Sequence, residues 1–196
     1  MGKIFYLMGK SASGKDTIYK KIREQCPNLK TIVLYTTRPM RDGETDGVEY
    51  HFTTAERLKQ FEQDGKVIEL RTYQTVYGPW SYATVDDGSI HLESENYLVI
   101  GTLESYQKLR TYFGDAALEP VYIQVDDGLR LERALARERM QKEPKYEELC
   151  RRFLADQEDF SAENLRSSGI EKSYNNEELT RCLDEILANI RNYTEF

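Results

Sequence analysis

The stretch that decides the fold is residues 4–17, which read IFYLMGKSASGKDT. Its apolar beginning has the length of a buried strand and breaks at once into glycine-rich sequence. Gly9, four residues, Gly14 and Lys15 form the frame of a P-loop, whose backbone N–H groups curl around phosphate oxygens. A helix directly after this loop would point the positive end of its dipole at the same phosphates, and Lys15 would reach the outer ones. The predicted nucleoside triphosphate site comprises Gly9, Ser11, Ala12, Ser13, Gly14, Lys15, Asp16 and Thr17.

One position departs from the P-loop pattern. Asp16 follows Lys15 where a Ser or Thr hydroxyl would bind Mg²⁺. A carboxylate is also a hard ligand for Mg²⁺, which makes Asp16 the candidate metal ligand. The simpler alternative is an ordinary glycine-rich turn in which Asp16 caps the helix. The spacing of the glycines, the lysine, and the flanking strand and helix favour the P-loop.

Length and composition indicate a soluble globular protein. The 196 residues suffice for one domain with insertions. A net charge of −7 disfavours nucleic-acid binding, so phosphate binding must depend on local arginines and backbone groups. Three widely spaced cysteines without metal-ligand spacing indicate reduced thiols and a cytoplasmic location. The first apolar run is too short for a signal peptide or a membrane span, so we expect no membrane association. The oligomeric state stays open.

The order of predicted elements is typical of an α/β protein. Strands are predicted at residues 4–8, 31–35, 97–100, 121–125 and 170–174, and helices at residues 16–26, 103–113, 129–141, 145–165 and 177–192. Between them, helix signals become rare. Short strands are predicted at residues 49–52, 66–70 and 73–77, with one helix capped by Thr53. We therefore expect a core of residues 1–35 and 96–196 with a parallel sheet, and a mainly β insertion over residues 36–95.

A second group of polar residues lies in that insertion. Arg38 and Arg41 are three apart on an extended arm and can converge on one dianionic phosphate. Tyr50 and Tyr77 offer hydroxyl donors, and Glu69 offers a carboxylate that could accept the N1–H and N2–H bonds of guanine. Taken singly, these are ordinary surface arginines, core tyrosines and a solvated glutamate. Their order after a P-loop favours a binding site for a phosphorylated acceptor.

In these motifs the chain resembles the guanylate kinase family. The matching residues are 9–17, 36–44, 46–50 with Phe52, 67–69 and 77–78, and the resemblance weakens beyond them. It implies a three-layer P-loop fold, ATP as phosphoryl donor, Mg²⁺ as cofactor and the reaction of GMP with ATP to give GDP and ADP. It also implies that Arg38, Arg41, Tyr50 and Tyr77 bind the acceptor phosphate and that Glu69 selects guanine.

The resemblance further implies a helical lid over about residues 129–155. The family's lid arginines correspond to Arg133 and Arg137, which share a helix face, and to Arg152 on the next helix. Such arginines neutralise charge as the phosphoryl group is transferred. A solvated charged helix is the alternative for this stretch. The asparagine on the adenine side corresponds to Asn175, or to Asn176 if the alignment shifts by one.

The sequence also departs from the family pattern. Leu34 or Tyr35 stands where a serine helps to read guanine, Pro79 follows the Tyr-Gly pair, and Ile100 and Thr102 replace strand-end aspartates. We therefore expect guanine specificity to depend mainly on Glu69, and Asp16 to replace the missing carboxylates as a Mg²⁺ contact.

Two alternatives remain at this point. The P-loop and residues 99–101 also resemble ribose 1,5-bisphosphate phosphokinases, which would make another phosphate monoester the acceptor. A non-catalytic guanylate-kinase-like module is the other.

Overall fold

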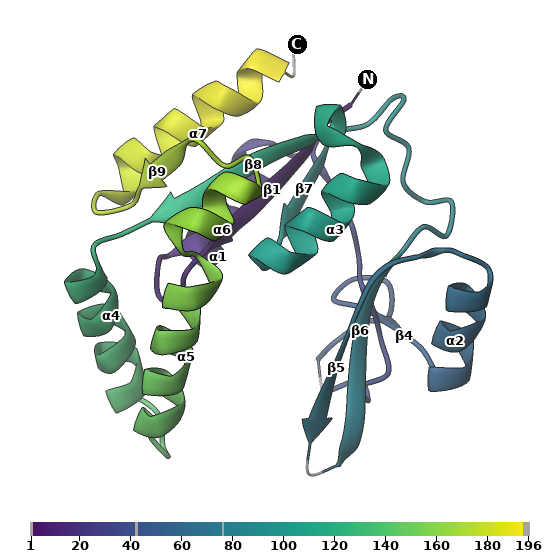
Figure 1. Ribbon diagram of the computed structural model, residues 1–196, viewed down its shortest axis with the longest axis horizontal. Helices are drawn as coiled ribbons and strands as arrows, with labels where there is room; N and C mark the ends of the chain where they lie inside the picture. The colour runs from purple at the N-terminus through teal and green to yellow at the C-terminus, as the bar shows by residue number, and fades with distance from the viewer. Residues whose placement is uncertain (1, 42, 76, 194–196) are drawn as a thin grey trace.

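The computed structural model describes residues 2–41, 43–75 and 77–193. Its centre is a five-stranded sheet in the order β2-β7-β1-β8-β9, in which the paired strands are parallel (Figure 1). The strands are β1 (Ile4–Gly9), β2 (Lys30–Thr31), β7 (Tyr97–Ile100), β8 (Leu118–Gln124) and β9 (Ser173–Asn175). The predicted α/β class with a parallel core sheet is confirmed.

Helices cover both faces of this sheet. Successive side chains of a strand point to opposite faces. Phe5 and Leu7 of β1 pack with α1 (Lys15–Gln25) and α7 (Leu179–Tyr193), whereas Tyr6 packs with α3 (Leu103–Phe113). All three side chains are almost completely buried, and each such burial contributes about 1.5–3 kcal/mol. The result is the predicted three-layer arrangement, with the P-loop at the end of its central strand.

A second sheet forms the insertion. Its order is β4-β3-β6-β5, and the strands are β3 (Tyr35–Thr36), β4 (His51–Phe52), β5 (Val67–Thr75) and β6 (Gly78–Val85). The helix α2 (Ala55–Gln63) packs Leu58 and Phe61 against Ala83 and Val85 of β6. Its cap is Thr54, whose hydroxyl accepts a hydrogen bond from the Arg57 backbone N–H, and not the predicted Thr53. The expected mainly β character, with one helix, is confirmed.

Two strand predictions in this region were wrong. The predicted strand at residues 31–35 is divided between β2 in the parallel sheet and β3 in the second sheet, with residues 32–34 linking them. An apolar run indicates that a segment is buried. It does not show that the first part of the segment pairs in one sheet and the last part in another. Two strands were predicted, at residues 66–70 and 73–77, but residues 67–75 form one strand, β5, which pairs antiparallel with the unpredicted β6. Residue 76 lies outside the described residues.

The predicted lid consists of two packed helices. These are α4 (Asp127–Arg139) and α5 (Tyr146–Asp159), which lie beside each other on the same side of the parallel sheet as the insertion (Figure 1). The predicted helix at residues 145–165 is interrupted after α5, because the Ser161 hydroxyl caps a separate helix, α6 (Ala162–Ser167). A short 3₁₀ helix, η1 (Asp115–Ala117), precedes β8. Over the described ranges, no helix has the length and apolar character needed to cross a membrane.

Candidate active site

The P-loop connects the end of β1 to the start of α1, and its two glycines are needed for different reasons. A Cβ atom at Gly9 would lie 2.6 Å from the carbonyl oxygen of Ile123 on β8, so a side chain does not fit there. Gly14 has a φ of 85° and is the cap residue of α1. Ala12 is also left-handed, with a φ of 62°. These backbone conformations turn the loop tightly over the helix N-terminus, which suits phosphate binding.

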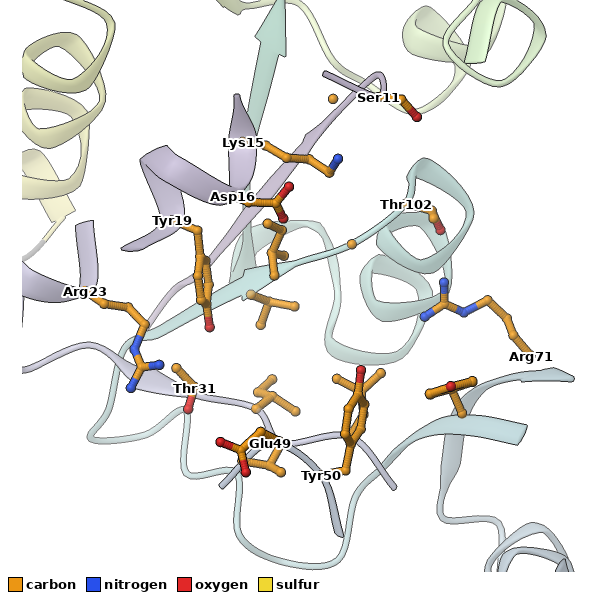
Figure 2. Close-up of a pocket in the computed structure, with 18 of the residues that line it drawn as sticks. Ser11, Lys15, Asp16, Tyr19, Arg23, Thr31, Glu49, Tyr50, Arg71 and Thr102 are labelled. Carbon is orange, nitrogen blue, oxygen red and sulfur yellow. The ribbon is translucent and has the colours of Figure 1, made fainter. Parts of the chain in front are cut away.

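A cavity of about 490 Å³ extends from the P-loop to the insertion. Figure 2 shows the side chains of Lys15 and Asp16 projecting into it from the start of α1, with Tyr50 on the opposite wall. The end of β7 forms a third wall at residues 100–102. Residues predicted to bind the phosphoryl donor and one predicted to bind the acceptor therefore share one cavity.

Asp16 is available as a metal ligand. The cap of α1 is Gly14, so Asp16 lies in the first helical turn and does not cap the helix. It is exposed and lines the cavity beside Lys15. Among the described residues, no group of three or more acidic, His or Cys side chains could hold a metal by itself. Proteins usually bind Mg²⁺ through one or two carboxylates together with substrate phosphates and water.

The arm residue Arg38 is held by Glu44. Arg38 is 4% exposed, and its guanidinium donates to the two carboxylate oxygens of Glu44 at 3.0 and 2.7 Å. These hydrogen bonds raise the pKa of Arg38 and lower the pKa of Glu44. Arg41 is exposed, and its backbone N–H also donates to Glu44, at 2.7 Å. The structure thus brings the Arg38 guanidinium and the Arg41 backbone N–H to one carboxylate.

The two predicted tyrosines lie in different places. The Tyr50 ring lies under the Arg38 guanidinium, with 5.3 Å between the ring centroid of Tyr50 and Cζ of Arg38. Tyr50 also lines the cavity. Tyr77 is 82% exposed and stacks on Trp80 near the β5–β6 turn, with ring centroids 6.0 Å apart and planes 7° from parallel. It does not line the cavity in the described structure, whereas Tyr82 of β6 does.

Glu69 lies below the cavity surface. It is 3% exposed and accepts hydrogen bonds from the hydroxyls of Ser105 (2.7 Å) and Thr84 (3.3 Å). Its carboxylate also pairs with Arg71, at 3.1 Å from Nε. Of the described residues, Arg71 and not Glu69 lines the cavity.

The predicted lid arginines surround the outer side of the P-loop. Arg133 on α4 donates to the carbonyl oxygen of Asn176 at 3.1 Å. Arg137 and Arg152 come from different helices and line one small space next to Ser11. Arg152 also lies 3.5 Å from Glu148, so part of this surface has the exposed ion pairs expected of a solvated charged helix.

Asn176, and not Asn175, contacts the P-loop. Its side-chain amide donates to the carbonyl oxygen of Ser13 at 2.8 Å, and the residue is 4% exposed. A Cβ atom at Gly14 would collide with this amide. Asn175 is exposed, and its side-chain oxygen accepts from the backbone N–H of Glu177.

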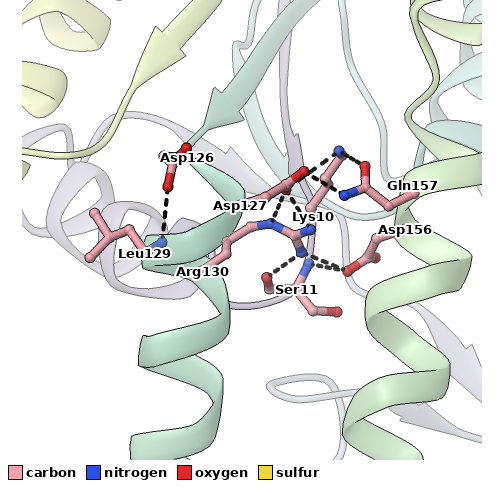
Figure 3. Close-up of polar contacts among 8 residues, drawn as sticks. All are labelled: Lys10, Ser11, Asp126, Asp127, Leu129, Arg130, Asp156 and Gln157. Carbon is pink, nitrogen blue, oxygen red and sulfur yellow. Dashed lines mark hydrogen bonds and ion pairs between the residues drawn. The ribbon is translucent and has the colours of Figure 1, made fainter.

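A network that the sequence did not predict ties the lid helices to the P-loop (Figure 3). Arg130 on α4 is 1% exposed and donates to the Ser11 carbonyl at 3.0 Å and to Asp156 of α5 at 3.2 Å. Asp156 in turn accepts from the Ser11 backbone N–H at 2.8 Å. Arg130 also donates to Asp127, which lies 3.8 Å from Lys10 of the P-loop. Ser11 is therefore bound through both of its backbone polar groups.

Comparisons with known proteins agree with this geometry. The profile of the family described as guanylate kinase matches residues 1–176 of the 196. The chain belongs to the guanylate kinase family. A guanylate kinase of Helicobacter hepaticus is 30% identical over 138 residues, which cover 70% of this chain and 68% of that protein.

Shorter stretches are similar to other guanylate kinases. The Oceanobacillus iheyensis protein is 38% identical over 99 residues, which cover 48% of each chain. The Mycolicibacterium paratuberculosis protein is 44% identical over 68 residues, which cover 35% of this chain and 30% of that protein. The matched stretches thus span from 30% to 68% of the length of these relatives.

The structural comparison supports the fold. The crystal structure of guanylate kinase from Anaplasma phagocytophilum has a TM-score of 0.60 and 19% sequence identity, and the alignment covers 100% of this chain and 87% of that one. The predicted P-loop fold of the guanylate kinase family is confirmed.

Sequence reasoning missed several residues of the site. Arg71 was detectable in principle, because it lies two residues after Glu69 on the same strand and therefore faces the same way. No pattern marked Arg130 or Asp156, since their importance arises from contacts between separate helices. Asp42 of the matching arm lies outside the described residues.

Proposed function

We propose that this member of the guanylate kinase family transfers a phosphoryl group from ATP to a nucleoside monophosphate, with GMP as the favoured acceptor. The observation that carries the proposal is the cavity of about 490 Å³ that Lys15 and Tyr50 share. A direct transfer requires donor and acceptor phosphates to lie in line in one space, and family membership supplies the reaction class.

In the proposed reaction, a phosphate oxygen of GMP forms a bond with the γ-phosphorus of ATP while the bond to the ADP oxygen breaks. Positioning and charge neutralisation dominate such a transfer, so no covalent intermediate is needed. Bound Mg²⁺ would neutralise phosphate charge, and Asp16 would hold it. The P-loop amides and Lys15 would hold the donor phosphates, and Arg133, Arg137 and Arg152 would neutralise the transferring group.

The acceptor phosphate would bind to the arm. Arg38, Arg41 and Tyr50 would contact it, with the phosphate replacing Glu44 as the partner of the Arg38 guanidinium and of the Arg41 backbone N–H. Tyr77 would join them only after movement of the hairpin end. We assign this role to residues 36–95 and the lid role to residues 129–155, and place Asn176 on the adenine side. Free, widely separated cysteines support action in the cytoplasm.

An acceptor panel tests the proposal. ADP release would be followed in a coupled assay with GMP, dGMP, AMP, UMP and ribose 1,5-bisphosphate. We expect the highest kcat/KM with GMP, and loss of turnover in Lys15→Met with retained folding. Preference for the sugar phosphate would refute GMP as the acceptor. Absence of both turnover and calorimetric ATP binding would indicate a non-catalytic module.

A further inference from the structure

Ser105 holds the carboxylate of Glu69 from the core side of the cavity. Its hydroxyl donates to Oε2 of Glu69 at 2.7 Å, and both side chains are buried. Glu69 belongs to β5 of the insertion, whereas Ser105 lies on α3, which packs against the parallel sheet. A short hydrogen bond to a charged group, shielded from water, is among the stronger polar contacts in proteins. This contact therefore fixes one oxygen of Glu69 relative to the core that carries the P-loop.

The other polar contacts of Glu69 are longer. On Oε1, the Thr84 hydroxyl donates at 3.3 Å and Arg71 Nη2 at 3.2 Å. Arg71 Nε lies 3.1 Å from Oε2 but makes no hydrogen bond in the described part of the chain. A carboxylate offers about four lone-pair positions. A base could therefore take the second position on Oε2 and the position that Arg71 Nη2 occupies on Oε1, while the Ser105 contact stays in place.

Arg71 covers this carboxylate on the side of the cavity and has other acidic neighbours. Figure 2 shows its side chain projecting from β5, and it lines the cavity whereas Glu69 does not. It also lines a second cavity of about 430 Å³ together with Glu104 of α3 and Asp159 of α5. Lys108, and to a smaller extent Arg71, lowers the pKa of Glu104. A base that displaced Arg71 from Glu69 would leave the guanidinium among carboxylates.

The start of α3 fixes the direction of the Ser105 hydroxyl. Thr102 is the cap residue, and its Oγ1 accepts from the Ser105 backbone N–H at 3.2 Å. The two hydroxyl oxygens lie 3.1 Å apart. Because Ser105 donates its one hydroxyl proton to Glu69, Thr102 is the donor in that pair. The carboxylate also lies beside the first turn of α3, where the helix dipole stabilises negative charge. Ser105 is thus oriented towards Glu69 before a ligand binds.

We infer that Ser105 is a positioning residue for base recognition, which holds Oε2 of Glu69 so that this carboxylate can accept N1–H and N2–H of guanine. This inference rests on the proposed function and specifies how its acceptor is selected. Guanine presents both donors on one edge, whereas adenine has an unprotonated N1 and no N2 amino group. Ser105 acts through Glu69 and does not itself touch the base.

Removal of the hydroxyl provides the first test. Ser105→Ala suits a helix and loses only the hydrogen bonds. We expect KM for GMP to rise by about tenfold, with kcat and KM for ATP within about threefold, because the contact strengthens acceptor binding equally before and during transfer. KM for AMP should change by less than about threefold, so the preference for GMP over AMP should fall. The control is Thr111→Ala, which removes an exposed hydroxyl of the same helix that donates to the Gln107 carbonyl, and all constants should stay unchanged.

A double-mutant cycle tests whether Ser105 acts through Glu69. Glu69→Ala leaves the Ser105 hydroxyl nothing to orient, so adding Ser105→Ala should lower kcat/KM for GMP by less than about threefold further. The same tenfold loss in both backgrounds would overturn the inference. So would a rise of the KM values for GMP, AMP and ATP together in Ser105→Ala, which is the result expected of a purely structural role. Ser105→Thr retains a hydroxyl and should keep KM for GMP within about threefold of the wild type.

The outcomes separate the two proposals. An unchanged KM for GMP in folded Ser105→Ala would overturn the inference while leaving GMP phosphorylation intact. If Ser105→Ala does not fold, Ser105→Gly removes the same hydroxyl and takes its place. If Glu69→Ala does not fold, the KM values of the single Ser105 variant for GMP, AMP and ATP still decide. A wild-type protein that phosphorylates no nucleoside monophosphate would overturn the proposed function, and the inference with it.

Discussion

Replacing Arg130 with methionine tests how firmly the lid helices are held to the P-loop. Arg130 is 1% exposed and contacts Ser11, Asp127 and Asp156 from the first turn of α4. Its guanidinium also lies 4.4 Å from the ring centroid of Phe153 on α5. Methionine retains much of the aliphatic stem but none of these polar contacts, so the variant isolates the contribution of the guanidinium.

The magnitude follows from the burial of each partner. The side chain of Asp127 is 46% exposed, so its pair with Arg130 is screened by water and contributes little. Asp156 is 15% exposed, and a shielded hydrogen bond to a charged group contributes about 1.5–3 kcal/mol. The hydrogen bond to Ser11 and the contact with Phe153 add about 1 kcal/mol together. We expect a loss of about 3 kcal/mol, which lowers Tm by about 6–12 °C in a chain of this length.

Calorimetry would measure the Tm of the wild type and of Arg130→Met. Urea unfolding at fixed temperature would measure their free energies of unfolding. The control is Arg151→Met on α5, because Arg151 pairs with Glu148 at 2.7 Å but its side chain is 65% exposed. We expect Arg151→Met to have the same Tm as the wild type. A decrease of less than about 3 °C for Arg130→Met would refute the conclusion that this buried network fixes the lid.

Three further predictions concern the P-loop and the core. Asp16→Ala should raise the Mg²⁺ concentration for half-maximal turnover by at least about tenfold; an unchanged titration would exclude Asp16 as a ligand. Gly14→Ala would place an alanine in a left-handed conformation, which costs about 1–2 kcal/mol, and its Cβ atom would collide with the Asn176 side chain. We therefore expect calorimetry to show weaker ATP binding and a lower Tm than for the wild type. Wild-type values for both would contradict the steric argument. Burial raises the pKa of Cys182 from 9.0 to about 11 and that of Tyr174 from 10.0 to about 12. Because the unfolded chain releases these protons first, urea stability should decline as pH rises from about 9 to 12, and a flat profile would disprove the assignment.

The sequence was informative where one local pattern determines the structure. The apolar strand, the two glycines and Lys15 gave β1, the P-loop and α1 correctly, since the loop path depends on backbone conformation within a few residues. The parallel strands at residues 97–100 and 121–125 were equally clear, because buried strands of this type are continuously apolar.

It was less informative where distant segments meet. Whether Arg38 faces a ligand or Glu44, and whether Glu69 is open or covered by Arg71, depends on contacts that spacing does not encode. The antiparallel β5–β6 pair was missed, since its residues alternate irregularly between polar and aromatic types. The Arg130 network could not be predicted either, because it joins the P-loop, α4 and α5, which are far apart in the sequence.

The stack of Trp80 on Tyr77 has a spectroscopic consequence. Trp80 is the single tryptophan of the chain, so light absorbed selectively by indole is re-emitted from one place on the insertion. The neighbouring ring lies nearly parallel at 6.0 Å, and any separation of the two rings would alter the brightness and wavelength of that emission. The insertion therefore carries a native optical reporter of its own rearrangement, readable by stopped-flow mixing without labels.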